Sequence, residues 1–136
     1  MKKILAFLLI ALLISGCESN SGNKSIDEGD VFVVGMECNY LPFNWQTNTQ
    51  SDTAVELEGS GYADGYDVYI AKEIAESLDK KLVIKKLAWN GLQPALESGE
   101  IDAIIAGMTA DEEREKGIDF TTPYYQSEMV MIVRGD

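Results

Sequence analysis

The sequence predicts an α/β domain built on a mostly parallel sheet. Two short apolar runs, 31–36 and 101–106, have the continuous pattern of strands that are buried on both faces. A third expected strand covers 82–87, and helical spacing of apolar residues marks 66–78 and 90–98. The order strand, helix, strand, helix, strand requires crossover connections, which are typical of parallel sheets.

Each expected helix has its own apolar face. The helix over 66–78 places on one face Val68, Ala71, Ile74, Ala75 and Leu78. Asp67 is a candidate N-cap or first-turn acid, because negative charge is favourable at a helix N-terminus. The helix over 90–98 ends at Gly99 and turns inward Leu92, Ala95 and Leu96.

The remaining segments are expected to be less regular. Pro42 ends any strand after the first one, and three aromatic residues around it are in a loop context, namely Tyr40, Phe43 and Trp45. Residues 46–64 are polar and Gly-rich, and they leave room only for a short hairpin near 54–57. One or two helical turns are expected over 111–116, and they should end at Gly117. Extended chain is expected at 118–120 and at 129–133.

The composition narrows the class of function. The chain has 136 residues, a net charge of -12 and no histidine. Nucleic acid is excluded as a partner, because phosphate binding needs clustered Lys and Arg, which the sequence lacks. The lack of histidine excludes His-based triads and most zinc sites. Two cysteines cannot form a disulfide framework, and neither common phosphate-binding glycine motif occurs, so we expect no metal and no cofactor.

Residues 1–16 are expected to be a signal peptide. Two lysines precede an apolar run at 4–14 that is too short to span a bilayer as a helix. A short membrane anchor or a buried core helix are the alternatives. The four residues ending in Cys17 resemble a bacterial lipobox, which implies that Cys17 receives acyl chains such as palmitate. Residues 17–30 are then a flexible tether, and the domain covers 31–136.

Polar and aromatic residues follow the expected strands. In an open parallel sheet, ligands bind outside the carboxyl ends of the strands. The residues placed at that edge include Glu37, Tyr40, Trp89, Gly107, Thr109 and Arg114. A guanidinium binds a carboxylate through two hydrogen bonds, a carboxylate meets an ammonium group, and aromatic rings cover a carbon skeleton. This set suits a zwitterion.

Three stretches resemble one known family, the family 3 bacterial solute-binding proteins. These proteins are the extracytoplasmic amino-acid receptors of ABC importers. The stretches are MECNYLPFNW (36–45), GYDVYIAKEIAESL (65–78) and AWNGLQPALESGEIDAIIAGMTADEEREKGIDFTTPYY (88–125). The sequence departs from the family at Tyr69, where an acidic residue is usual, and at Asp111, which replaces a threonine before the short helix. Both residue types are good N-caps, so the second change is mild.

The resemblance implies a periplasmic-binding-protein-like fold of type II and an amino acid held between two lobes. By that resemblance, Arg114 binds the ligand α-carboxylate with help from the Thr109 hydroxyl and the Gly107 backbone. Tyr40 and Trp89 are aromatic walls, and Glu37 meets the amino group or a polar side chain. The implied protein is a monomer without enzymatic activity. Its partners are permease subunits, and its lipid anchor lies on the outer surface of a Gram-positive cell or on the periplasmic side otherwise.

The same residues also fit simpler roles. Arg114 could be a solvated helix residue paired with Glu115 or Asp111, and Thr109 could cap the short helix together with Glu112. Trp89 could cover the core and Glu37 could be solvated. Packing roles are expected for Phe43, Trp45 and Cys38.

The chain is also expected to be incomplete. In the resembled family, the segment matching 129–134 leads into a second lobe, so this sequence holds an incomplete first lobe that binds poorly by itself. Part of the sheet is then uncovered, with Ile104 and Val133 as candidates for exposure. Three interpretations remain open: a fragment of an amino-acid receptor, a functional single-lobe lipoprotein, and a dehydratase-like or sensor relative. An enzyme would need an acid-base pair, and only Glu37 lies near the rim.

Overall fold

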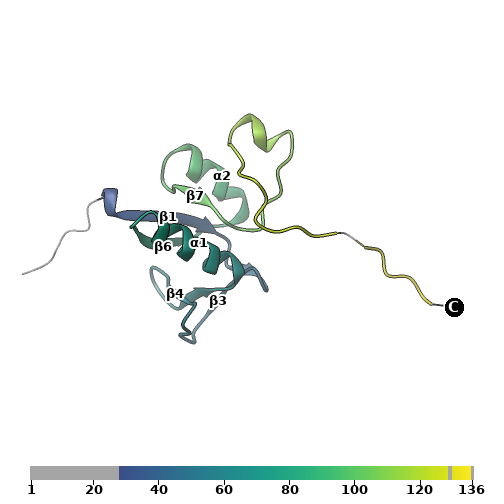
Figure 1. Cartoon of the computed structure of the whole chain (residues 1–136), viewed down its shortest axis with the longest axis horizontal. Coiled ribbons are helices and arrows are strands. Elements are labelled where there is room, and N and C mark those ends of the chain that lie inside the picture. Colours follow the sequence, from purple (N-terminus) through teal and green to yellow (C-terminus); the bar gives the residue numbers. More distant parts are fainter. Residues whose placement is uncertain (1–27, 129, 136) are drawn as a thin grey trace, which may run out of the picture.

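The computed structural model describes residues 28–128 and 130–135, and its centre is a parallel sheet of three strands (Figure 1). The strands are β1 (Val31–Met36), β6 (Lys81–Lys86) and β7 (Ala103–Ile104), in the order β6-β1-β7. Val34 of β1 pairs with Ile84 on one side and with Ala103 on the other, and both pairings are parallel. The predicted α/β fold with a mostly parallel sheet is confirmed.

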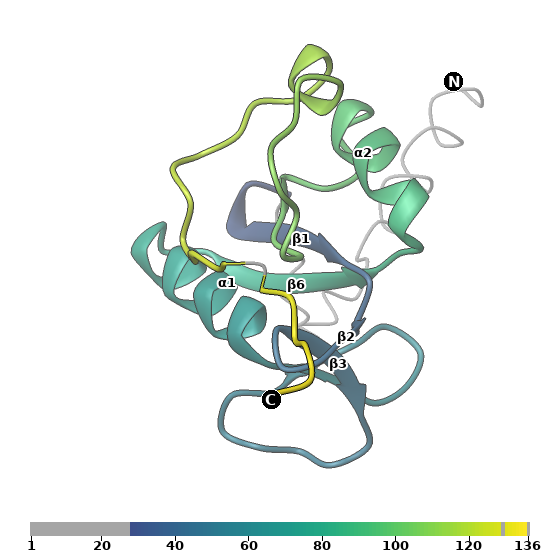
Figure 2. The same ribbon diagram turned by 90° about the vertical axis from the view of Figure 1, so that its right-hand side faces the viewer.

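Two helices flank the parallel strands (Figure 2). Helix α1 (Tyr66–Ser77) packs against β6 and β1, and helix α2 (Trp89–Glu97) packs against β1 and β7. Gly35 allows the close approach of α2, because a Cβ at that position would lie 2.5 Å from the Ile101 side chain and 3.1 Å from that of Leu92. One apolar cluster forms the core, and its most deeply buried members are Val34, Met36, Val68, Ala71, Ile84 and Leu92.

Helix α1 buries a narrower face than the sequence predicted. Val68, Ala71 and Ala75 are buried, whereas Ile74 is 36% and Leu78 51% exposed. Ile74 lies at the edge of the apolar stripe on a helix of 3.6 residues per turn. Leu78 lies beyond the last helical residue, at the C-cap. The predicted apolar face is therefore buried only at Val68, Ala71 and Ala75.

A second, antiparallel sheet occupies the region predicted to be loop. Its strands are β2 (Asn39–Tyr40), β3 (Asn44–Thr47), β4 (Val55–Glu56) and β5 (Tyr62–Asp64), in the order β2-β3-β5-β4. Pro42 lies in the turn between β2 and β3, so it does not interrupt a strand. Short polar strands of this kind depend on pairing with distant residues, such as Trp45 with Asp64, and carry almost no local pattern. Only the hairpin near 54–57 was foreseen, and there β4 pairs with β5.

The last third of the chain contains little regular structure. The predicted strand 101–106 is reduced to β7, although Ile101, Ile105 and Ala106 are buried as expected. A single turn, η2 (Arg114–Lys116), lies inside the helical segment predicted over 111–116, and Gly117 follows it. Residues 118–120 form no strand.

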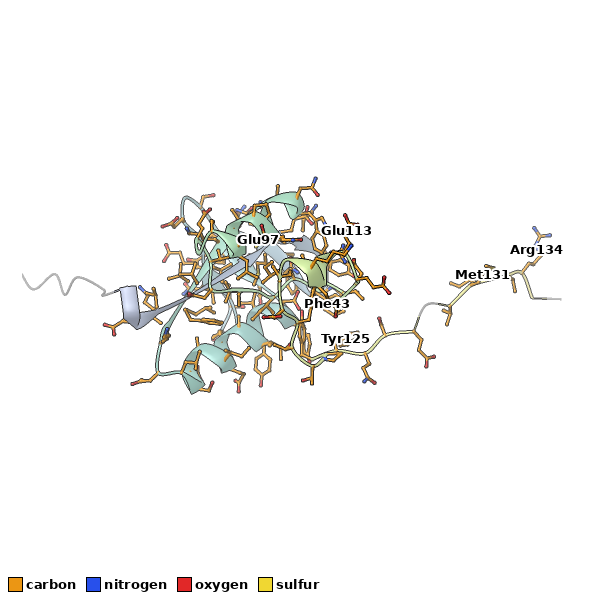
Figure 3. The ribbon with its side chains drawn as sticks, turned by 90° about the horizontal axis from the view of Figure 1, so that it is seen from above. Phe43, Glu97, Glu113, Tyr125, Met131 and Arg134 are labelled. Atoms are coloured by element: carbon orange, nitrogen blue, oxygen red, sulfur yellow. The ribbon has the colours of Figure 1, made fainter. Side chains whose placement is uncertain are left out.

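The end of the described chain runs away from the domain, as the Met131 and Arg134 labels in Figure 3 show. Residues 130–133, the described part of the segment expected to be extended, form no strand. A strand needs a neighbour for its N–H and C=O groups, and this segment does not lie beside either sheet. Val133 is 74% exposed, as predicted, and Ile104 is half-buried.

The signal peptide, Cys17 and most of the expected tether lie outside the described residues. The described part of that tether forms one turn, η1 (Glu28–Asp30), immediately before β1. In the described ranges, we find no helix with the length and apolar content needed to cross a bilayer.

Candidate functional site

The predicted site residues follow the carboxyl ends of the parallel strands. Glu37 comes directly after β1, Trp89 begins α2 shortly after β6, and Gly107 follows β7. Because the three strands are parallel and adjacent, these segments emerge at the same edge of the sheet. The structure therefore brings residues from three separate stretches of sequence to one rim.

Arg114 and Trp89 lie together at this rim. The guanidinium carbon of Arg114 is 6.0 Å from the centre of the Trp89 ring, within the range of a cation–π attraction. The two side chains line a shallow hollow between α2 and the segment around η2. Glu97 and Glu113, labelled in Figure 3, line the same hollow, as do Asn90, Gln93, Met108 and Asp111. This contact between Arg114 and Trp89 was not predicted from the sequence.

Within the described part of the chain, the Arg114 guanidinium makes two polar contacts, and both use the same nitrogen. Its Nη1 donates to the backbone carbonyl of Thr109 at 2.8 Å and forms an ion pair with the carboxylate of Asp111. Among the described residues, neither Nε nor Nη2 makes a hydrogen bond. A guanidinium has five N–H donors, and a carboxylate needs two parallel ones. Arg114 can therefore keep its contact to Thr109 while binding a ligand carboxylate.

Asp111 holds the turn that carries Arg114. Its Oδ1 accepts hydrogen bonds from the backbone N–H groups of Glu113 at 3.0 Å and Arg114 at 2.9 Å. The bond from the Arg114 backbone is the main reason that the pKa of Asp111 lies below its ordinary value, and the guanidinium charge adds to this effect. Asp111 thus performs the capping expected at its position. It also forms the ion pair considered as the simpler role of Arg114.

Tyr40 and Gly107 are in contact. Gly107 has a φ of +62°, and a Cβ there would lie 3.0 Å from Cε1 of Tyr40, so the ring occupies the space beside the glycine. The N–H of Gly107 donates to the hydroxyl of Tyr124 at 3.0 Å. The Gly107 backbone was expected to help bind the ligand, but its N–H is used inside the protein. Tyr40 itself is half exposed, at 50%.

Glu37 lies apart from Arg114. It is half-buried and lines a separate hollow together with Cys38, Asn39 and Lys86. Thr109 is exposed. The expected packing roles are seen for Cys38, which is 4% exposed, and for Phe43, which stacks on Tyr40 with ring centres 5.0 Å apart. Burial raises the pKa of the Cys38 thiol to about 11, so the group behaves as a small apolar side chain.

Sequence reasoning missed a buried polar network beside the site. Asp67 and Asn44 are 0% and 1% exposed, and the carboxylate of Asp67 accepts hydrogen bonds from Asn44 and Tyr124. Burial raises the pKa of Asp67, and the two hydrogen bonds act against that rise. The available signal was an aspartate next to the apolar face of the predicted helix. It was interpreted only as an N-cap or first-turn acid.

The described residues do not form a candidate metal-binding site. No group of three His, Cys, Asp or Glu side chains in that part of the chain is arranged to hold an ion. The side chains present instead offer a guanidinium, aromatic faces and carboxylates, which is the chemistry of a binding site for a small zwitterion.

The comparisons with known proteins point to one family. The sequence pattern of the bacterial extracellular solute-binding proteins, family 3, matches residues 32–136. The ABC transporter glutamine-binding protein GlnH of Bacillus subtilis is 31% identical over 98% of this chain and 52% of its own length. A probable histidine-binding protein of Campylobacter jejuni is 33% identical over 93% of this chain and 48% of its own length.

Solved structures agree with this result. The arginine-bound form of domain 1 from TmArgBP has a TM-score of 0.60 and 35% identity, over 74% of this chain and 71% of that one. A substrate-binding protein of an amino-acid ABC transporter has a TM-score of 0.60 and 40% identity, over 70% of this chain and 39% of that one.

The match in length is partial. The chain spans about half the length of the curated relatives it matches. The matched region nevertheless includes the parallel sheet, both helices and every candidate ligand residue from Glu37 to Arg114. The chain belongs to the bacterial extracellular solute-binding proteins, family 3.

Proposed function

We propose that this protein is the substrate-binding component of an amino-acid ABC importer. In this role it binds a polar or charged amino acid by the ligand carboxylate at Arg114. The observation that carries the proposal is the position of Arg114 over Trp89, with Nε and Nη2 making no hydrogen bond among the described residues. Relatives named for glutamine, histidine and arginine binding support the ligand class.

The ligand is proposed to lie between two lobes, of which this chain supplies one face. Arg114 binds the carboxylate, Trp89 and Tyr40 cover the carbon skeleton, and Glu37 meets the amino group or a polar side chain. Trp89 and Tyr40 are 37% and 50% exposed, which leaves ring surface for a ligand and for a facing lobe. The proposed role is binding without catalysis, which is supported by membership of a family of solute-binding proteins.

A functional single lobe is the second candidate. One similar structure is the arginine-bound form of a single domain, domain 1 from TmArgBP. This chain covers 71% of that domain, so the comparison bears directly on whether one lobe can hold an amino acid.

A thermal-shift screen of the protein expressed from its complete reading frame tests the proposal. The panel contains the twenty amino acids, together with sugars, peptides and divalent metals. Stabilisation by one or a few polar or charged amino acids is expected, because a ligand that binds only the folded state raises the melting temperature. Stabilisation by sugars, metals or peptides alone would contradict the proposal.

We further propose that the protein works on the extracytoplasmic face of the membrane, delivers its ligand to permease subunits and acts as a monomer. The family is one of extracellular proteins. Anchoring through acylated Cys17 rests on the lipobox-like sequence alone. Replacing Cys17 with Ser should move the protein from the membrane fraction to the soluble fraction and abolish labelling with a palmitate analogue. Unchanged detergent partitioning of that variant would contradict the anchor.

A further inference from the structure

We propose that Tyr124 and Asp67 are positioning residues for the amino-acid site, because together they hold Gly107 beside Tyr40 of β2. The inference rests on the proposed function for its link to binding. Neither residue was singled out for the site by its sequence pattern, and neither is needed there as a direct ligand contact.

The centre of the arrangement is the buried carboxylate of Asp67, in the first turn of α1. Its Oδ2 accepts a hydrogen bond from Nδ2 of Asn44 at 2.7 Å, and its Oδ1 accepts one from the hydroxyl of Tyr124 at 2.7 Å. Asp67 is completely buried and Asn44 is 1% exposed. A buried carboxylate that lost one of these donors would keep an unsatisfied oxygen, which is costly, so both bonds are strongly favoured.

Two backbone amides extend the network to the rim. The N–H of Cys38 donates to Oδ1 of Asn44 at 2.9 Å, and the N–H of Gly107 donates to the hydroxyl oxygen of Tyr124 at 3.0 Å. The hydroxyl of Tyr124 donates its single hydrogen to Asp67, so its oxygen is free to accept a hydrogen bond from the Gly107 N–H. Asn44 and Tyr124 each donate to Asp67 and accept from a backbone N–H, so Cys38 and Gly107 are linked through one carboxylate.

The network fixes two of the predicted site residues relative to each other. Tyr40 lies between Cys38 and Asn44 in sequence and pairs with Asn44 across strands β2 and β3. The ring of Tyr40 packs against Gly107, which has a φ of +62°. Release of Gly107 from Tyr124 would therefore let the Gly107 segment and the Tyr40 ring move apart. Residues of a binding site need to be held within about 0.5 Å of their productive geometry, so such a displacement would weaken binding.

The test uses Tyr124→Phe in the protein expressed from its complete reading frame. This change removes one oxygen atom and keeps the ring. The matched control is Tyr125→Phe. The rings of Tyr124 and Tyr125 both lie near that of Tyr66, at 6.2 and 5.9 Å, and Tyr125 is labelled in Figure 3 near Phe43, whose ring is 5.0 Å away. The hydroxyl of Tyr125 makes no hydrogen bond among the described residues. Asp67→Asn is a second variant, which keeps the shape of the side chain but replaces one of its two acceptor oxygens by a donor, so it cannot accept from both Asn44 and Tyr124.

Two readouts are measured for each variant. The first is the amide resonance and hydrogen exchange of Gly107 and Cys38 by NMR, without any ligand. The second is the affinity for each of the twenty amino acids by isothermal titration. In Tyr124→Phe, Gly107 should exchange faster with a shifted resonance, and in Asp67→Asn at least one of Gly107 and Cys38 should do so. The affinity for the amino acid should fall about tenfold or more in both variants, because the hydrogen-bond network around the Asp67 carboxylate then no longer holds the site in place. Tyr125→Phe should match the parent in both readouts.

The outcomes separate a positioning role from a purely structural one. A Gly107 amide that is unchanged in Tyr124→Phe overturns the inference. The inference is also overturned if the Gly107 amide is released in Tyr124→Phe while that variant binds its amino acid within twofold of the parent affinity. The network would then stabilise the fold without positioning the site. If no amino acid binds the parent, the proposed function fails, and the amide measurements still decide whether Tyr124 holds Gly107.

Discussion

Asp111 and Arg114 contact each other in two ways. The carboxylate of Asp111 accepts a hydrogen bond from the Arg114 backbone N–H at 2.9 Å and also forms an ion pair with the Arg114 guanidinium. The first contact holds the turn η2, and the second occupies Nη1 of the side chain proposed to bind the ligand. The same acid therefore positions Arg114 and competes with the ligand carboxylate for it.

Arg114→Ala should remove most amino-acid binding and leave the fold intact. The side chain is half-buried at the rim and belongs to no core cluster. Loss of a guanidinium–carboxylate pair at an interface should cost roughly 2–5 kcal/mol, part of it from the ligand carboxylate left without a partner. Isothermal titration with the best ligand, alongside circular dichroism, measures both effects.

The matched control for this prediction is Lys81→Ala, which removes an exposed positive charge at the opposite end of β6. It should bind like the parent. Arg114→Lys keeps the charge but loses the fork geometry, so it should recover only part of the affinity. An affinity of Arg114→Ala within twofold of the parent would rule out the carboxylate role.

Asp111→Thr should bind the amino acid more tightly than the parent. Threonine can still accept the backbone hydrogen bonds of the turn, but it releases the guanidinium from its ion pair. The ion pair between Arg114 and Asp111 is exposed, so the affinity for the ligand should rise only modestly, about twofold to fivefold at low salt and less at high salt. Titrations at two salt concentrations measure it.

Glu115→Thr is the control, because it removes the same charge from an exposed neighbour of Arg114. It should change the affinity less than Asp111→Thr. If the affinity for the amino acid rises equally in both variants, the effect comes from the net charge near the site. If Asp111→Thr binds more weakly than the parent, then Asp111 is needed chiefly to position Arg114.

Gly65→Ala should destabilise the fold. Gly65 precedes α1 with a φ of +127°, and a Cβ there would clash with the carbonyl oxygen of Phe43 and lie 2.7 Å from the Trp45 ring. That carbonyl accepts a hydrogen bond from the Asp67 N–H at 2.8 Å, so it cannot move away freely. A strained backbone of this kind should cost roughly 1–3 kcal/mol or more.

Urea unfolding followed by circular dichroism measures this cost. The control is Gly91→Ala inside α2, where a Cβ would meet nothing within 4 Å. Alanine favours helix over glycine, so Gly91→Ala should be as stable as the parent or more stable by up to about 1 kcal/mol. Equal stability of the two variants would show that the first turn of α1 adjusts without strain.

The soluble chain 18–136 should bind free amino acids weakly, with a dissociation constant above ~100 μM, which corresponds to about 5.5 kcal/mol. Tyr40 and Trp89 are 50% and 37% exposed, whereas a competent pocket buries most of its ligand. The ion pair to Arg114 would also be screened by water. Isothermal titration against the twenty amino acids tests this, with arginine of particular interest because domain 1 from TmArgBP has an arginine-bound form. Tighter binding would support the single-lobe candidate.

The parts of the fold that were predicted correctly are those with a local pattern. The apolar run 31–36 became β1, and the helical spacing over 66–78 became α1 with Val68 and Ala71 fully buried. Burial of apolar surface drives folding, and its period along the chain is visible without knowledge of any partner. The candidate residues at the rim followed from the same logic, because parallel strands direct their carboxyl ends to one edge.

The sequence by itself determined the parallel α/β core, the family and the candidate residues at the carboxyl ends of its parallel strands. Only the tertiary structure decided the antiparallel sheet β2-β3-β5-β4, the pairing of Arg114 with Asp111, and the bond between Tyr124 and Asp67, which are 57 positions apart. The reason is physical. Hydrophobic periodicity is a property of neighbouring residues, whereas a hydrogen bond or ion pair depends on which polar groups the completed fold brings within about 3 Å of each other.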